Sequence, residues 1–374
     1  MSISHRDKQA IFARSLALTP GLGSRSIRQL ARYFEDDTER LCKATPKELK
    51  ALEGVTDNLV RVLRKVKSCY EQAAFEYHEA KRYGLEMVAF SDTDFPHRLR
   101  VFDDAPVVLF TKGAPLPFYH RHSIGVVGTR NATSYGRSLT EQWIEQWAAY
   151  QPCIVSGLAY GIDIAAHQAA IKHNTPTVAV LGNGLDSVYP AVHRSVANRM
   201  LDNGGLISEF PPGTKPDRQN FPMRNRIVAM LSDALVVVEA AQKGGALITA
   251  NMAFDYNKEV YAVPGKPADV YSEGCNALIA SNKAALLHNP QQVPTDLRWE
   301  DASQNKVRQA ELFVELNAEE KQLIETLGRQ RETPLEVLCS EMNERPSVVL
   351  SRLLEMELKG LVRAMPGNRF AALL

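Results

Sequence analysis

The sequence predicts an α/β protein in which a doubly wound, mostly parallel sheet is flanked by two smaller helical domains. Three observations support this prediction. The 374 residues exceed what one hydrophobic core usually organises, so two or three domains are expected. Short apolar runs alternate with helical stretches between about residues 85 and 290. On both sides of that region, apolar residues recur at helical spacing instead.

The N-terminal region, residues 1–80, has the pattern of helices joined by glycine-containing turns. Pro20–Gly23 precedes a helix that is expected to begin at Ser24. Glu53–Thr56 precedes another that is expected to begin near Asp57. Two successive units of this kind are typical of a tandem helix-hairpin-helix-like domain.

The central region, residues 85–290, has the pattern of a parallel sheet covered on both faces. Continuous apolar runs indicate strands that are buried on both sides, and the helical stretches between them indicate crossover connections. The domain is therefore expected to be Rossmann-like, with its ligands at the carboxyl ends of the strands. The expected strands are Ser123–Val127, Cys153–Val155, Thr177–Leu181, Gly205–Ile207, Ala234–Val238 and Glu259–Val263. The expected helices are Gly136–Tyr150, Ile162–His173, Arg194–Asn203, Asn225–Leu231 and Ala246–Tyr256.

The C-terminal region predicts a winged-helix-like domain at residues 308–374, joined by a linker at residues 291–307. The linker lies in a polar stretch that contains two prolines and has no periodicity. Three helices and a β-hairpin are expected after it. The residues that indicate them are Leu312, Leu316, Leu323 and Leu327 on one helical face, Pro334–Met342, Ser347–Lys359, and the alternating tail around Pro366–Asn368.

Composition narrows the class of protein. Apolar residues make up 45% and charged residues 23%, as in ordinary globular proteins. The formal net charge is +1, so any nucleic-acid face must be a local cluster of cations. The five cysteines form no CxxC pair, so no metal site is expected. Their odd number and wide spacing favour a reducing compartment over a disulfide framework. Because no apolar run reaches signal-peptide or membrane-spanning length, a cytoplasmic protein without a membrane segment is expected.

Glycine-containing turns follow several predicted strands and form a candidate anion-binding edge. Gly128 and Arg130 follow the first strand, and Ser156 and Gly157 follow the second. Backbone N–H groups near such a glycine, together with the positive end of the next helix, can hold a phosphate. Arg130 would project from that edge. The alternative is that each glycine serves only the packing of strand against helix.

Asp163 and His167 lie one turn apart on the helix expected after Gly157. Such a pair can carry acid–base chemistry, but the sequence places no nucleophile beside it. A helix-capping role for Asp163 explains the pattern better. We therefore predict no catalytic residue and expect that the protein is not an enzyme.

The segment Arg218–Arg226 is the strongest candidate for contact with single-stranded nucleic acid. Three arginines within it surround Phe221 and open a helix. Arginine binds phosphate bidentately, and an aromatic ring stacks on any base for about 1–3 kcal/mol. The alternative is a solvated charged loop with Phe221 in the core. Lys243 and Lys266, near the ends of two later strands, are weaker candidates.

These motifs, in this order, resemble the DprA/Smf family of DNA-processing proteins. The resemblance extends from about Ser91 to Leu287 and includes VGTRNATSYG, SGLAYGIDIAAH, LGNGLDSVYP, FPMRNRIVAMLSDALVVVEA and GGALITANMAF. It implies binding of single-stranded DNA, loading of the recombinase RecA in natural transformation and recombination, a homodimer, and no cofactor. By motif position it implies DNA contacts at Arg130, Ser156, Gly157, Arg218, Phe221, Arg224, Asn225, Arg226, Lys243 and Lys266.

Two other functions remain open. The LOG-like nucleotide phosphoribohydrolases share a related architecture, but they typically carry Pro-Gly-Gly-x-Gly-Thr-x-x-Glu where this chain has Gln242–Thr249. Alternatively, the central domain is a scaffold and the winged helix is an adapter for duplex DNA or a partner protein. The helix Ser347–Lys359 is not basic, which favours protein contact over duplex binding.

Overall fold

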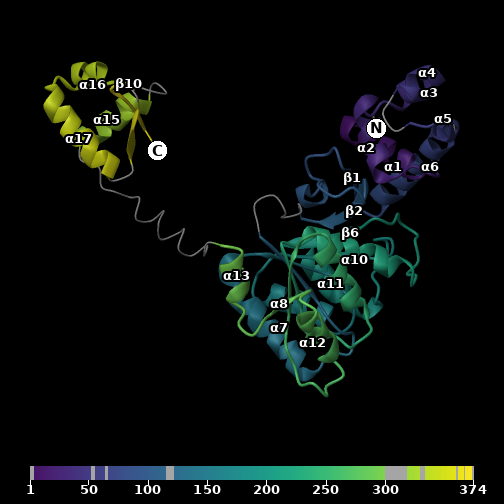
Figure 1. Cartoon of the computed structure of the whole chain (residues 1–374). Helices are drawn as coiled ribbons and strands as arrows, with labels where there is room; N and C mark the ends of the chain where they lie inside the picture. The colour runs from purple at the N-terminus through teal and green to yellow at the C-terminus, as the bar shows by residue number, and fades with distance from the viewer. Residues whose placement is uncertain are drawn as a thin grey trace. The chain divides into compact units, whose positions relative to one another are not determined.

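The computed structural model describes residues 4–51, 55–63, 66–114, 122–299, 318–328, 333–358, 361–365 and 367–372. The chain divides into two units, Met1–Ser303 and Gln304–Leu374. Figure 1 shows the first unit as a helical part followed by a sheet with helices on both faces.

The first unit is built on a mixed sheet whose centre is parallel. Over the described residues it has nine strands in the order β1-β2-β6-β5-β4-β3-β7-β8-β9. All six predicted strands are present, and the Rossmann-like prediction is confirmed. The parallel strands are β3 (Ser123–Val127), β4 (Cys153–Ser156), β5 (Thr177–Leu181), β6 (Gly204–Ser208), β7 (Ala234–Val237), β8 (Glu259–Ala262) and β9 (Ala285–Leu286). The sequence analysis did not predict β9, or β1 (Glu86–Ala89) and β2 (Val108–Gly113), which add an antiparallel edge beside β6.

Helices cover both faces of this sheet because neighbouring residues of each strand point to opposite sides. On β4, Val155 joins one core and Ile154 the other. The first core includes apolar side chains of α10 and α11, and the second includes those of α7 and α8. The helices of this region are α7 (Ser134–Trp147), α8 (Ile162–Lys172), α9 (Arg194–Met200), α10 (Asn220–Leu231), α11 (Gly245–Asp255) and α12 (Glu273–Ala280).

Helix α10 begins at Asn220, earlier than the predicted Asn225. The prediction placed Pro222 before the helix, but proline is tolerated in a first turn, where its missing N–H would have no partner within the helix. As a result, Phe221 and Arg224 lie on the first turns of a helix instead of a loop, and their spacing is fixed by the helix.

The N-terminal helices pack on the antiparallel edge of the sheet. Helix α1 contacts α6 and also β1 and β2, and its side chains share one core with Phe110 of β2. Two of the helices begin at the predicted residues, Ser24 and Asp57. The helices are α1 (His5–Ala17), α2 (Ser24–Tyr33), α3 (Thr38–Lys43), α4 (Pro46–Lys50), α5 (Asp57–Leu63) and α6 (Val66–Arg82).

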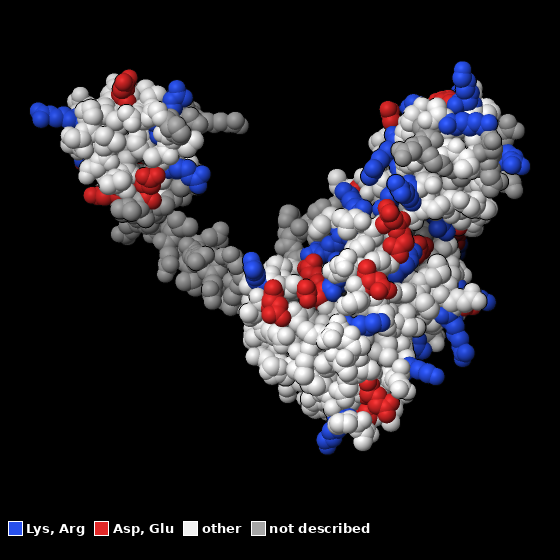
Figure 2. Space-filling view, in the orientation of Figure 1, with Lys and Arg blue, Asp and Glu red and all other residues white. Residues whose placement is uncertain are grey.

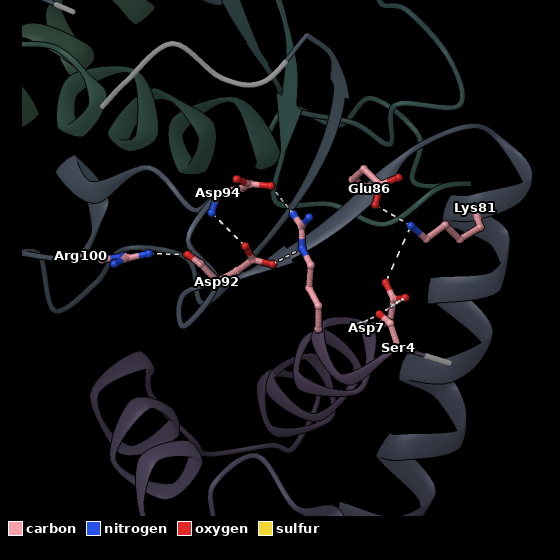
Figure 3. A network of polar contacts seen from close by, with 8 residues as sticks. Ser4, Asp7, Lys81, Glu86, Asp92, Asp94 and Arg100 are labelled. Carbon is pink, nitrogen blue, oxygen red and sulfur yellow. Dashed lines mark hydrogen bonds and ion pairs between the residues drawn. The ribbon is translucent and has the colours of Figure 1, made fainter. Parts of the chain in front are cut away.

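Polar contacts reinforce this junction (Figure 3). Arg6 of α1 pairs with Asp92 and, at 2.7 Å, with Asp94, both of which follow β1. Lys81 of α6 lies 2.5 Å from Glu86 of β1. The Asp92 side chain is 5% exposed, so its pairing is screened less by solvent than a fully exposed pair. These contacts join α1 and α6 to the first strand.

The predicted linker, residues 291–307, is packed structure over its first part. Helix α13 (Gln292–Asp296) buries Val293 in the core of the sheet domain. Trp147 Nε1 donates to the carbonyl of Pro290 at 2.8 Å, and Trp299 stacks on His122 at 4.3 Å between ring centroids. Residues 291–299 therefore belong to the first unit, and residues 300–307 lie outside the described residues.

The second unit has the winged-helix order that the sequence predicts. A small sheet in the order β10-β12-β11 packs with helices around a core that includes Leu323, Leu338 and Phe370. The predicted Leu312 and Leu316 lie outside the described residues. The elements are α15 (Ala318–Gly328), β10 (Thr333–Pro334), α16 (Leu335–Met342), α17 (Pro346–Leu358), β11 (Val362–Met365) and β12 (Arg369–Ala372).

Within the described part of the chain, no helix has both the length and the apolar character that crossing a membrane requires. On the face in view in Figure 2, cations and carboxylates are interspersed, without one large patch of a single sign. This agrees with a net charge near zero and leaves any anion-binding site to a local arrangement.

Candidate nucleic-acid interface

A cavity of about 220 Å³ lies at the carboxyl ends of the central strands. Strands β3 and β7 are neighbours, and the chain continues from β3 to one side of the sheet and from β7 to the other. This is the topological switch point at which doubly wound folds bind their ligands. The turns after β3, β4 and β7 and the start of α10 supply its walls.

Three predicted residues meet at this cavity. The Arg130 guanidinium lies 5.2 Å from the centroid of the Phe221 ring, and that of Arg224 lies 5.9 Å from it. Phe221 is only partly buried and Arg130 is exposed. An aromatic face with a solvent-accessible cation beside it can accept a base and an adjoining phosphate. The sequence segments around residues 130 and 221 are thus one site.

Arg224 contributes to this site through contacts with protein acceptors. Its side chain is buried, and it donates to the carbonyl of Gly157 at 2.5 Å and to that of Val180. It also donates to Asn225 Oδ1 at 2.9 Å and lies 3.9 Å from the Asp163 carboxylate. Burial lowers the pKa of Arg224. The sequence analysis assigned Arg224 to a phosphate, but most of its donors face protein acceptors, which fixes α10 to the ends of β4 and β5.

Gly157 makes room for the buried side chain of Arg224. A Cβ atom built on Gly157 would lie 2.0 Å from Arg224 Nη1, so only glycine leaves room for the buried guanidinium. The glycine was expected either to approach a phosphate or to serve packing. It lines the cavity with its backbone and also makes space for Arg224.

Two other predicted contacts lie away from the cavity. The hydroxyl of Ser156 is fully buried and donates to the carbonyl of Val126 at 2.6 Å, because strand alternation turns this side chain towards a covered face of the sheet. Arg226 pairs with Glu209 at 2.5 Å and donates to the carbonyl of Asp104, on the opposite side of α10 from Arg224's contacts. Both side chains are already engaged by protein acceptors.

The remaining candidates differ in position. Lys243 is exposed and lines the cavity, and Asn225 lines it from α10. Arg218 and Lys266 are exposed but are not among the residues that line the cavity. The structure therefore brings together Arg130, Gly157, Phe221, Arg224, Asn225 and Lys243.

The first helix N-terminus at the switch point is already occupied by a carboxylate. Glu239, which follows β7, is 6% exposed and accepts from the Thr133 N–H at 2.9 Å and from the Thr133 hydroxyl at 2.5 Å. Thr133 is the N-cap of α7, the helix whose N-terminus holds the pyrophosphate in dinucleotide-binding Rossmann folds. A Cβ on Gly136 would lie 2.4 Å from this carboxylate. Glu239 was missed by the sequence analysis, and its signal was an acidic residue directly after a buried strand.

The second helix N-terminus at the switch point is open. Helix α11 has Gly244 as its N-cap, with no side-chain hydrogen bond, and Gly244, Gly245 and Ala246 line the cavity. A helix N-terminus carries about half a positive charge and unpaired backbone N–H groups. Together with Lys243 and Arg130, it makes the β7–α11 turn the most favourable place for an anion in this crevice.

The Asp163–His167 pair is structural. Asp163 lies in the first turn of α8 and accepts from the Ala159 N–H at 3.4 Å, while Gly161 is the N-cap. His167 is fully buried, and its Nδ1 lies 2.7 Å from the Thr177 hydroxyl. Burial lowers the pKa of His167 to about 3, so its ring is neutral at physiological pH. Among the described residues, no group of side chains has the arrangement of a metal site.

Comparison with known proteins identifies the family. The sequence profile described as DNA recombination-mediator protein A matches residues 86–298, and that of the DprA winged helix domain matches residues 310–368. Protein Smf of Synechocystis sp. is 32% identical over 386 aligned positions, which cover 94% of this chain and 95% of that protein. DNA processing protein DprA of Streptococcus pneumoniae is 39% identical over 208 positions, which cover 56% of this chain and 73% of that protein.

Comparison with solved structures supports the same family. The structure of DNA processing protein A from Streptococcus pneumoniae covers 80% of this chain and 99% of its own, with 29% identity and a TM-score of 0.62. That of the Helicobacter pylori protein, described for its unique single-stranded DNA binding mode, covers 58% and 99%, with 26% identity and a TM-score of 0.52. On this sequence and structural evidence, the chain belongs to the DprA/Smf family of DNA-processing proteins.

Proposed function

We propose that this protein binds single-stranded DNA in the crevice at the switch point. The observation that carries the proposal is the meeting of Arg130, Lys243 and the open N-terminus of α11 with the partly exposed ring of Phe221. A single strand can present a phosphate and an unstacked base to these groups at once, whereas the bases of a duplex are stacked inside it. The single-stranded DNA binding mode described for the Helicobacter pylori relative supports this ligand.

The proposed division of labour follows from the geometry. The β7–α11 turn, Lys243 and Arg130 hold phosphates, Phe221 stacks on a base, and Arg224 keeps the helix that carries Phe221 in place. None of these contacts reads the edge of a base, so binding is expected to be largely independent of sequence. The alternative of a LOG-like nucleotide hydrolase is disfavoured because the segment Gln242–Thr249 lacks the proline and the third glycine of that family's motif, and the trailing glutamate is also missing.

The test is a fluorescence anisotropy titration with labelled oligo-dT. Phe221→Ala should weaken binding by about 1–3 kcal/mol, or roughly 5- to 150-fold. Arg130→Ala should also weaken it while the fold is kept, since Arg130 is exposed. Phe75→Ala and Arg82→Ala, at exposed positions on α6, are the matched controls and should bind like the wild type. Equal affinity for all five proteins would refute the proposed site.

Salt provides an independent test of the phosphate contacts. Binding through counterion release should weaken by about 0.7 log units per phosphate contact for each tenfold rise in salt. Arg130→Ala should reduce that slope by about one contact, whereas Phe221→Ala should leave it unchanged. A salt-independent affinity would contradict contact with a polynucleotide.

We further propose the roles that the family resemblance implies. The protein would act in the cytoplasm as a homodimer in natural transformation and recombination, loading RecA onto single-stranded DNA without catalysing a reaction itself. Residues 1–80, 85–299 and 308–374 are the proposed domains, and the central one ends at residue 299 instead of the expected 290 because α13 packs in its core. Light scattering measures the oligomeric state. RecA strand exchange on DNA coated with single-strand binding protein should accelerate with the wild type but not with Phe221→Ala.

A second candidate function belongs to the winged-helix unit. Arg352 on α17 is engaged by Glu319 at 2.7 Å and Glu344 at 3.8 Å, and Leu354 on the same helix is 61% exposed. Leu350, four residues earlier on α17, is 41% exposed as well. Two neighbouring exposed leucines beside a neutralised arginine favour protein contact over duplex DNA. Residues 318–374 should therefore add no duplex affinity, which a gel shift with and without this segment measures.

A further inference from the structure

We propose that Tyr160 and Tyr189 form a second base-stacking subsite beside Phe221, for the nucleobase next to the one on Phe221. The inference rests on the proposed binding of single-stranded DNA and extends it from one stacking position to at least two. Neither tyrosine was among the DNA contacts that the motifs implied. Both belong to motifs, SGLAYGIDIAAH and LGNGLDSVYP, that the sequence analysis quoted without assigning a role to the tyrosine.

The two tyrosines converge from separate parts of the chain. Tyr160 lies in the turn between β4 and α8, and Tyr189 in the loop between β5 and α9. Both line a small cavity of about 20 Å³ together with Arg130 and Phe221. Tyr160 is 47% exposed and Tyr189 44% exposed, so each has ring surface open to a ligand. Large aromatic residues exposed beside a binding crevice are typical of recognition surfaces.

The Tyr160 ring is braced on its protein side. Tyr160 packs edge-on against His193, with the centroids 5.0 Å apart and the planes at 68°. His193 is itself buried, and its Nδ1 lies 2.8 Å from the carbonyl oxygen of Leu158, in the same turn as Tyr160. Rings held in this way lose little conformational entropy when a base packs on them.

The geometry around Phe221 indicates which ligand fits. The centroids of Tyr189 and Phe221 are 6.1 Å apart, with the planes at 36°. The two rings thus present neighbouring, tilted faces, which a flexible strand with independently oriented bases can follow and a stacked duplex cannot. Arg130 lines both of the cavities that these rings line and can pair with the phosphate that links the two nucleotides.

The experiment separates stacking from every other contribution. Tyr160→Leu and Tyr189→Leu keep an apolar side chain but remove the aromatic face, and Tyr160→Phe and Tyr189→Phe keep it. Tyr83→Leu, at a position 40% exposed at the end of α6, is the matched control. Affinities are measured by fluorescence anisotropy for oligo-dT and for an oligonucleotide of the same length in which all bases are missing.

Each leucine variant should bind oligo-dT about 5- to 150-fold more weakly than the wild type does, and it should bind the abasic strand equally well. The phenylalanine variants and Tyr83→Leu should match the wild type on both strands. The subsite is refuted if the leucine variants bind oligo-dT normally, or if they lose equal affinity for both strands, as a structural role would require. If Phe221→Ala loses oligo-dT affinity and neither tyrosine-to-leucine variant does, the proposed function stands and the subsite fails. If the wild type binds no oligo-dT, the proposed function itself fails.

Discussion

The buried Arg224 offers a sharp test of how the interface is held together. Replacing Arg224 with methionine keeps most of its length and removes its charge and donors. The carbonyls of Gly157 and Val180 then lose a charged donor, and Asp163 loses the cation 3.9 Å away while it stays buried. Removing one partner of a buried ion pair typically costs about 3–5 kcal/mol. We therefore expect Arg224→Met to destabilise the sheet domain by about that amount.

Urea unfolding followed by tryptophan fluorescence measures this loss. All three tryptophans lie in the first unit, at positions 143, 147 and 299, so the signal reports the domain that contains Arg224. The control is Arg218→Met, which removes an exposed arginine from the loop before the same helix and should leave the unfolding midpoint unchanged.

A second substitution tests the cause. If the cost arises partly from the unpaired carboxylate, adding Asp163→Asn to Arg224→Met should recover about 1–3 kcal/mol, because residues in contact couple by amounts of this order. An Arg224→Met variant that unfolds at the wild-type urea concentration would show that the buried hydrogen bonds do not hold α10 in place. It would restore the simpler interpretation of Arg224 as a phosphate contact.

Three further predictions concern the same edge of the sheet. Gly157→Ala places a Cβ atom 2.0 Å from Arg224 Nη1, so overpacking should lower thermal stability by about 1–3 kcal/mol in a melting experiment. Gly23→Ala should cost less, because Gly23 has a φ of −85° and no atom would lie within 4 Å of the added Cβ. Glu239→Ala leaves the Thr133 N–H and hydroxyl unpaired and should lower the free energy of unfolding by about 1–3 kcal/mol. Millimolar formate should restore part of this stability in differential scanning fluorimetry. An unchanged melting temperature would contradict the capping role of Glu239. Burial lowers the pKa of His167 from 6.5 to about 3, so the unfolded chain binds more protons than the folded chain between these pH values. The free energy of unfolding should therefore fall as the pH drops through that window, by about 2 kcal/mol from pH 7 to pH 5. A His167→Gln variant should lack this pH dependence in urea titrations.

Local patterns predicted the architecture well where burial dictates residue type. The strands Ser123–Val127 and Thr177–Leu181 have the predicted bounds, because strands buried on both faces leave an uninterrupted apolar run. The edge strands β1 and β2 were missed, since Glu86–Ala89 is short and Val108–Gly113 ends in half-buried polar residues. The N-terminus of α10 was missed because a proline inside a first turn has the same sequence appearance as one before a helix.

For the interface, the sequence by itself determined which types of side chain follow the strands of a doubly wound sheet, and hence that Arg130 and Phe221 belong at its carboxyl edge. Only the tertiary structure decided which of these side chains face solvent. Arg224, Arg226 and Ser156 resemble ligand contacts in sequence, yet their polar groups meet carbonyls and a carboxylate from other elements. Glu239, Tyr160 and Tyr189 also lie at this edge of the sheet, although their loops are far apart in the chain. The physical reason is that a polar side chain pairs with whatever acceptor the fold brings nearest, and that neighbour is set by long-range packing, which the local sequence does not encode.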